Sequence, residues 1–231
     1  MANNKDTSLG SPSKWTPFHM RFCLITLLAL LLYFEEVQAD ENVLMDPKSI
    51  LSTAKRMDFV GKNNFSLEKT NEGFFLLSVP QGSSSGLYQK VDIKGQELTR
   101  VRWTWRVDTV HASADLRQLS REDTAATIFF IFGEPSFFNR DVPTLAYVWS
   151  STPVKEGTIL QSLRYQSLKY IQLRGKSSAG KWETEERNIS ADYEAIFGEK
   201  PDRLKYIALF SDNDQTLEPA KALFGKIVEL N

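Results

Sequence analysis

The alternation of apolar and polar residues is clearest in residues 98–110. Val101, Trp103, Trp105 and Val107 fall on one side of an extended chain, while three arginines and a threonine fall on the other. This period of two predicts a strand with one face in the core and one face in water. Because aromatic side chains dominate protein cores, we expect both tryptophans to pack inside the fold.

Further extended runs follow at intervals of about 8–12 residues, and they predict roughly nine or ten strands in all. Residues 123–134 are apolar on both faces beyond Thr127, as expected for a central strand. In residues 143–151 large side chains alternate with small ones, which also indicates a strand. Asn71 and Gly73 separate two extended runs and predict a hairpin.

Two short segments have helical signals instead. In residues 46–57, Asp46 is a suitable N-cap and the proline after it fits the first helical position. The second predicted helix spans residues 190–197, with Ser190 as N-cap and Gly198 directly after its last turn. No long amphipathic helix separates the strands, so a parallel α/β fold is excluded. The sequence therefore predicts an all-β fold, an antiparallel β-sandwich with two short helices.

The N-terminus has the layout of a secretory signal peptide. Basic residues precede thirteen mostly apolar residues, and the small residues Val37 and Ala39 occupy positions −3 and −1 of a cleavage site. As a helix the apolar run would be about 20 Å long, whereas a bilayer core is about 30 Å thick. We therefore predict a signal peptide over residues 1–39 and a single β-sandwich domain over residues 40–231. We also expect a periplasmic or secreted protein with no stable membrane span after processing.

Composition narrows the chemistry of the processed chain. The one cysteine, Cys23, lies in the apolar run, so we expect no disulfide, no cysteine nucleophile and no cysteine-ligated zinc. After residue 39 the one histidine is His111, in a polar loop where we expect it to be solvated. The sequence has no phosphate-binding or dinucleotide-binding fingerprint. Its net charge of −1 lacks the basic excess of a protein that binds nucleic acid.

The polar face of the strand in residues 98–110 carries Arg100, Arg102 and Arg106. A row of guanidinium groups suits a carboxylate or phosphate ligand. The same row equally suits ion pairs with acids on neighbouring strands. Arg102 and Arg106 are therefore candidate ligand-binding residues, with cross-strand ion pairs as the alternative.

Aromatic side chains provide a second set of candidates, because their rings can stack on sugars. The candidates are Tyr147, Trp149, Tyr165 and Tyr170. For each of them the alternative is packing in the core, where large aromatic rings are usually found.

The stretch FSDNDQT places Asp212 and Asp214 directly after an apolar run, and three interpretations are open. The two carboxylates can turn the chain by bonding nearby N–H groups. They can hold a hard cation such as Ca²⁺ together with a distant acid, Asp123 or Asp108, since Ca²⁺ takes six to eight oxygen ligands. They can also form a catalytic pair on a glycosidic bond. The spacing is not that of an EF-hand, so Ca²⁺ is a candidate cofactor without a self-contained motif.

Three patterns together resemble a known family: W-x-W-R-V in residues 103–107, L-A-Y-V-W in residues 145–149, and D-x-D-x-T followed by A-x-F-G-x-I in residues 212–227. In order and spacing they resemble a family of exported bacterial proteins known as domain of unknown function 3047. The resemblance covers nearly all of residues 40–231. It implies a β-sandwich of jelly-roll type and a periplasmic or secreted location, and it implies no established activity.

Three functional hypotheses are left. The first is a non-catalytic module that binds a carbohydrate or another polar ligand, as indicated by the sandwich fold, the surplus aromatics and the lack of nucleophile machinery. The second is a carboxylate-dependent glycoside hydrolase or lyase, which needs a cleft with two acids about 5–10 Å apart. The third is a structural envelope protein whose edge strands join a partner.

Overall fold

The computed structural model describes Met1, residues 41–136 and residues 141–230. The predicted signal peptide therefore lies, apart from Met1, outside the described residues. Within them, two β-sheets pack against one another, and two α-helices and three short 3₁₀ turns connect the strands. No helix in this part of the chain is long and apolar enough to cross a bilayer.

The first sheet has six strands, and all its neighbouring strands run antiparallel. The alternating run found in the sequence is β6, and its four apolar residues are buried as predicted. In spatial order the strands are β11 (Glu183–Arg187), β6 (Val101–Thr109), β13 (Lys221–Leu230), β4 (Gly73–Val79) and β3 (Asn64–Thr70), and β1 (Glu41–Met45) also pairs with β13.

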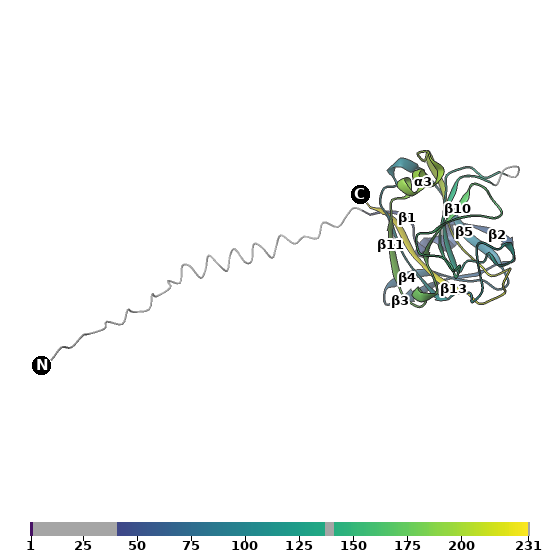
Figure 1. Cartoon of the computed structure of the whole chain (residues 1–231), viewed down its shortest axis with the longest axis horizontal. Coiled ribbons are helices and arrows are strands. Elements are labelled where there is room, and N and C mark those ends of the chain that lie inside the picture. Colours follow the sequence, from purple (N-terminus) through teal and green to yellow (C-terminus); the bar gives the residue numbers. More distant parts are fainter. Residues whose placement is uncertain (2–40, 137–140, 231) are drawn as a thin grey trace. The chain divides into compact units, whose positions relative to one another are not determined.

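The second sheet has seven strands, and it departs from the predicted antiparallel pattern at one place, where β8 and β10 run parallel. In Figure 1 the first sheet's β1, β11, β4 and β3 lie on the left of the domain and the second sheet's β5 and β2 on the right. In spatial order the strands are β2 (Lys55–Val60), β5 (Ser84–Lys94), β12 (Arg203–Asp212), β7 (Ala126–Ile131), β8 (Thr144–Trp149), β10 (Leu168–Arg174) and β9 (Ile159–Gln161).

One hydrophobic core fills the space between the sheets. The ring of Trp103 on β6 lies 5.2 Å from the ring of Tyr147 on β8. The ring of Trp105, also on β6, lies 5.6 Å from the ring of Trp149, also on β8. Residues on β6 and β8 with the same period of two thus meet face to face, which is how a sandwich buries two apolar sheet faces. The all-β fold class is confirmed, and the architecture is a β-sandwich of jelly-roll type.

Both predicted helices are present, with shifted ends. Asp46 caps α2 (Pro47–Thr53) as expected, since its carboxylate accepts a hydrogen bond from the main-chain nitrogen of Lys48 at 2.9 Å. The helix is shorter than predicted because the residues after it pair with β5 as β2. The N-cap of α3 (Ile189–Phe197) is Asn188, so the prediction of Ser190 was wrong by two residues. The three 3₁₀ turns are η1 (Gly95–Glu97), η2 (Leu119–Arg121) and η3 (Lys176–Ser178).

The segment between β6 and β7 crosses the outer face of the seven-stranded sheet. Its Leu116 is buried against Ala146 and Val148, the residues of β8 that point away from the core. The main-chain nitrogen of Leu116 also donates a hydrogen bond to Thr152 Oγ1 at 2.9 Å. The segment therefore covers one part of this outer face and leaves another part open.

Candidate functional site

The three aspartates singled out in the sequence come together at one end of the seven-stranded sheet. Asp212 is the last residue of β12, Asp214 lies in the turn that follows, and Asp123 precedes β7, the strand that pairs with β12. One carboxylate oxygen from each residue lies within 4.8 Å of the other two. We call these three residues the aspartate cluster.

Two of the three carboxylates, those of Asp212 and Asp123, accept several hydrogen bonds, whereas Asp214 accepts one from the adjacent Gln215. Thr124 donates to Asp212 Oδ1 from its main-chain nitrogen at 2.6 Å and from its hydroxyl at 2.9 Å. Asp123 accepts from the main-chain nitrogens of Gln215 and Thr216, at 3.2 and 2.7 Å, and from the Thr216 hydroxyl at 2.6 Å. The turn after β12 is therefore stabilised by Asp123, which lies in the loop before β7, as well as by residues of the turn itself.

The aspartate cluster carries acidic groups without paired basic side chains. Among the described residues no Lys or Arg forms an ion pair with any of the three aspartates. The positive charge of Arg164 favours the ionised form of Asp214 from a distance, but Arg164 forms its ion pair with Glu122. Burial, and next the charge of Asp123, raise the pKa of Asp212 well above its usual value and also raise the pKa of Asp214. Oδ1 of Asp214 is buried and accepts no hydrogen bond from the described chain.

His111 lies beside the cluster and is fully buried, so the prediction of a solvated loop histidine was wrong. The reason is that the segment between β6 and β7 packs onto the sheet. Neither ring nitrogen of His111 has a hydrogen bond of good geometry in the described part of the protein, although the main chain of Asp212 lies near the ring. Burial lowers the pKa of His111, while the carboxylates of Asp123 and Glu218 and the main chain of Asp212 oppose this effect. A neutral imidazole therefore borders the acids.

The open part of the same outer face forms a groove of about 640 Å³, which we call the sheet groove. Its floor and walls carry half-exposed rings: Tyr88 and Tyr206 lie edge to face at 5.8 Å, and Phe59 is 51% exposed at one side. Phe210 supports the floor, packing against Phe59 and Phe129 at 6.0 and 5.6 Å. Further lining residues are Met57, Ile131, Pro135, Ser136, Val142, Thr144, Tyr165 and Leu168.

Polar groups stand at two places around the sheet groove. Arg56 and Asp58 form an ion pair at 3.2 Å on β2. Glu134 accepts a hydrogen bond from the Tyr206 hydroxyl at 2.9 Å and pairs with Lys90 at 3.5 Å. The groove is thus mainly apolar in its lining, with a few placed polar groups that could fix the orientation of a ligand.

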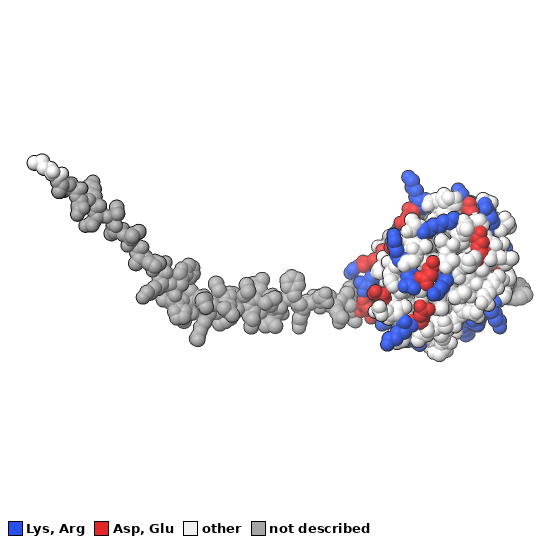
Figure 2. Space-filling model, turned by 90° about the horizontal axis from the view of Figure 1, so that it is seen from below, with Lys and Arg blue, Asp and Glu red and all other residues white. Residues whose placement is uncertain are grey.

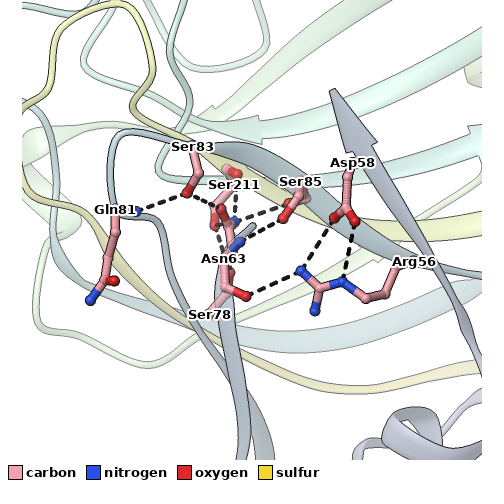
Figure 3. Close-up of polar contacts among 8 residues, drawn as sticks. All are labelled: Arg56, Asp58, Asn63, Ser78, Gln81, Ser83, Ser85 and Ser211. Carbon is pink, nitrogen blue, oxygen red and sulfur yellow. Dashed lines mark hydrogen bonds and ion pairs between the residues drawn. The ribbon is translucent and has the colours of Figure 1, made fainter. Parts of the chain in front are cut away.

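A buried network of small polar side chains anchors the Arg56 side of the groove (Figure 3). Asn63 lies between the two sheets, and its amide nitrogen donates to the carbonyl of Ser211 at 2.8 Å and to that of Ser85 at 3.0 Å. Ser78 and Ser211 share a hydrogen bond of 2.6 Å across the sheets. Arg56 Nη2 donates to the carbonyl of Asn63 at 3.3 Å, so the groove residue is tied to this network.

The predicted aromatic contacts divide into two kinds. Tyr147 and Trp149 are fully buried in the core, so the prediction that they contact a ligand was wrong. They occupy the inward face of β8, and their polar atoms bond Asp192 at 2.6 Å and the carbonyl of Gly175 at 3.0 Å. Tyr165 lines the sheet groove. Tyr170 points from the same outer face but packs beside Leu116 under the covering segment.

The two predicted arginines lie on the other sheet, away from the groove. Arg102 forms an ion pair with Glu41 and lines a smaller hollow of about 380 Å³ on the six-stranded sheet. Arg106 pairs with Asp108 at 2.6 Å and lies over the Trp182 ring at 4.5 Å. The alternative of an ion pair with an acid on another strand therefore describes Arg102, whereas Arg106 pairs with an acid on its own strand. Asp108 is used in this pair, so it is not part of the aspartate cluster.

Sequence reasoning missed most residues of the sheet groove, among them Tyr88, Tyr206, Phe59 and Arg56. A signal was present, because Tyr88 and Tyr206 each alternate with a buried aliphatic neighbour, Leu87 and Ile207. To predict that these two tyrosines line a groove while Tyr147 of β8 is buried, one must know which face of each strand meets the other sheet.

With the fold and the site described, comparisons with known proteins can be reported. A family model described as "Protein of unknown function (DUF3047)" matches residues 54–228. The chain belongs to this family. No curated protein matches it in sequence.

Solved structures similar to this DUF3047 protein include a family 11 carbohydrate-binding module of the cellulase Lic26A-Cel5E from Clostridium thermocellum, with 12% identity, a TM-score of 0.45, and 84% of this chain and 95% of that chain covered. A family 11 module from the same organism, in complex with a β-1,3-1,4-mixed-linked tetrasaccharide, has 14% identity, a TM-score of 0.45, and 83% and 95% covered. The K3 cleaved adhesin domain of Lys-gingipain from Porphyromonas gingivalis has 14% identity, a TM-score of 0.42, and 83% and 99% covered.

Proposed function

We propose that this protein is an exported, non-catalytic module that binds a neutral glycan chain in the sheet groove. The observation that carries the proposal is the groove on the outer face of the seven-stranded sheet, with half-exposed tyrosine and phenylalanine rings and a few polar groups. Its volume of about 640 Å³ falls within the range of ligand sites, which are mostly apolar with a small number of placed polar groups. The layout of residues 1–39 supports export.

The rings suit a sugar because each has an apolar face and, in tyrosine, a polar end. Tyr88 and Tyr206 lie on adjacent strands, so their edge-to-face pair forms a platform about two strands wide. The apolar C–H face of a pyranose can pack on such a platform while its hydroxyls reach Arg56, Asp58 and Glu134. A flexible polar ligand without ring faces would gain less from this lining.

The charges around the groove favour a neutral ligand. Arg56 is balanced by Asp58, and Lys90 is balanced by Glu134, so neither sign is left in excess. Charges of both signs are also mixed on the face of the domain that Figure 2 shows, where Lys and Arg alternate with Asp and Glu. A highly charged polymer would need a patch of one sign.

The groove acids are poorly suited to hydrolysis. A general acid on a glycosidic bond needs a raised pKa so that it stays protonated. The hydrogen bond from Tyr206, together with Lys90, instead lowers the pKa of Glu134. Asp58 is held in its ion pair with Arg56. These observations favour binding over catalysis.

The proposal is tested by measuring binding of soluble neutral glycans to the protein expressed from the full chain. Mixed-linkage β-glucan, xylan and galactomannan serve as probes in affinity electrophoresis, with isothermal titration calorimetry on matching oligosaccharides. Tyr206→Ala and Tyr88→Ala are each expected to weaken binding at least about tenfold, because the stacking platform is lost. Phe74→Ala is the matched control, since Phe74 is a half-buried aromatic residue on the six-stranded sheet.

Two results would contradict the proposal. Binding that survives both tyrosine substitutions, or falls equally in Phe74→Ala, places the ligand elsewhere. Release of reducing sugar from any probe, lost in Glu134→Gln, makes the protein an enzyme instead of a binding module.

A further inference from the structure

We infer that the aspartate cluster is a binding site for a divalent cation, with oxygen ligands that suit Ca²⁺. The first observation is geometric. Asp123, Asp212 and Asp214 each offer a carboxylate oxygen within 4.8 Å of the other two, so a single ion between them can contact all three. The inference concerns a site separate from the lining of the sheet groove and does not depend on glycan binding.

The second observation is a set of buried polar atoms without hydrogen-bond partners among the described residues. Both ring nitrogens of His111 have none, the side chain of His111 is completely buried, and Asp123 and the main chain of Asp212 are among the groups that act on it. Oδ1 of Asp214 and Oε1 of Gln215 are also buried and unpartnered. Buried polar atoms in native proteins normally have a partner, so this group of atoms is suited to binding a ligand. A bound cation would coordinate the oxygens, and a water molecule on the cation would give the imidazole a hydrogen-bond partner.

The third observation is the balance of charge. Three carboxylates converge, two of them buried, and within the described chain no basic side chain pairs with any of them. Like charges this close repel strongly where water is excluded. A divalent cation offsets that repulsion, as carboxylate-rich cation sites do.

The ligand types point to a hard cation. The converging atoms are carboxylate oxygens, with the free amide oxygen of Gln215 next to Asp214 and no thiolate in reach. Such oxygen sets select Ca²⁺, Mg²⁺ or Mn²⁺, whereas zinc favours nitrogen and sulfur. The carboxylates come from two strands and a turn, and this irregular arrangement suits the flexible coordination of Ca²⁺ better than the strict octahedron of Mg²⁺.

An ion at this position would tie the turn after β12 to the start of β7. Asp123 already holds that turn through Gln215 and Thr216. Asp212 also faces the same side of β12 as Tyr206 and Phe210, because residues at even spacing along a strand share a face. The cation would therefore stabilise the end of the strand that carries one ring of the groove.

The test is thermal unfolding of the whole protein, first in EDTA and then with CaCl₂, MgCl₂, MnCl₂ or ZnCl₂, with calorimetry to measure the dissociation constant. Calcium is expected to raise the midpoint by about 5–10 °C at a concentration about 100 times the dissociation constant. Asp214→Asn should abolish this rise. In EDTA the same variant should melt at a higher temperature than the wild type, because one repelling charge is gone. This reversal of sign distinguishes a cation ligand from a residue that only shapes the turn.

Asp214 is the residue to change because its carboxylate accepts a hydrogen bond only from the neighbouring Gln215 among those described, so the variant should fold. Asp202→Asn, at an exposed acid elsewhere, is the matched control and should leave the calcium response intact. If no metal shifts the midpoint while Asp214→Asn still stabilises the protein, the carboxylates share protons and the inference is wrong. A larger response to zinc than to calcium would overturn the assignment of a hard cation.

Discussion

Thr124 donates two hydrogen bonds to the same carboxylate oxygen of Asp212, from its main-chain nitrogen at 2.6 Å and from its hydroxyl at 2.9 Å. The hydroxyl in turn accepts a hydrogen bond from Thr127 at 2.8 Å. Asp212 is buried and has no basic partner among the described residues, so these donors offset part of the cost of burying its carboxyl group. The relationship also fixes Asp212 against the start of β7.

Replacing Thr124 with valine is therefore expected to lower the free energy of unfolding. Valine keeps the shape of the side chain but leaves Asp212 and Thr127 each short of a partner, a loss of about 1–3 kcal/mol. Urea unfolding in EDTA at pH 7 measures it. Thr124→Ser retains the hydroxyl and should lose less than half as much. A loss in Thr124→Ser as large as that in Thr124→Val would show that the methyl group contributes as much as the hydrogen bonds, and no loss in Thr124→Val would contradict the prediction.

Asn63 should be among the most sensitive polar residues of the core. Asn63→Ala removes the donor that bonds the carbonyls of Ser85 and Ser211 and leaves these acceptors buried without it. We expect a loss of about 2–4 kcal/mol in urea unfolding. Asn64→Ala, at the exposed neighbouring position, is the control and should change stability by less than about 0.5 kcal/mol. A small effect at Asn63 would mean that water replaces the amide in the network.

Gly86 has no room for a side chain. A Cβ atom there would lie 2.5 Å from the carbonyl oxygen of Leu209 and 3.2 Å from the side chain of Phe210. Gly86→Ala is therefore expected to cost about 1–3 kcal/mol through overpacking, and to weaken glycan binding because Phe210 supports the groove floor. Thermal unfolding and glycan titration measure the two effects. Gly175→Ala, where the nearest atom would be 3.7 Å away, should leave both unchanged.

Asp115 should contribute to acid stability. The hydrogen bonds from Arg117 lower the pKa of Asp115 to about 2. A carboxyl group whose folded pKa is below its unfolded value of about 4 adds stability above pH 4 and loses it as the pH falls towards 2.

The comparison of wild type with Asp115→Asn checks this sign. The wild type should be more stable by about 1–2 kcal/mol at pH 5, a figure reduced because Arg117 is half exposed, and the difference should shrink towards zero near pH 2. Urea midpoints between pH 2 and 6 measure it. A difference that stays constant over this range would mean that Asp115 acts through its shape and not through its charge.

The fold could be predicted from the sequence because its signals are local. The period of two in β6 and the hairpin signal before β4 each depend on residues adjacent in the chain, and both are confirmed. The parallel pairing of β8 and β10 was not predicted, since no local pattern encodes which distant strands become neighbours.

The candidate site was predictable only in part, for a related reason. The aspartates at the end of β12 were visible as a motif, and their meeting with Asp123 requires the pairing of β12 with β7. The tyrosines were harder. Tyr147 and Tyr206 both stand in strands, and only the packing of the sheets decides that the first is buried and the second lines a groove. His111 is buried by a segment whose polar composition predicts exposure.

The pairing of β1 with β13 has a consequence for how the domain can be connected. Glu41 lies opposite Leu230, so the first and last described strands end side by side in the six-stranded sheet. A short peptide can therefore join these two ends, and new ends can be opened in a surface loop without breaking a strand. The groove belongs to the other sheet. A tether, a surface support or a fused domain attached at either end would therefore lie on the sheet that does not carry the sheet groove.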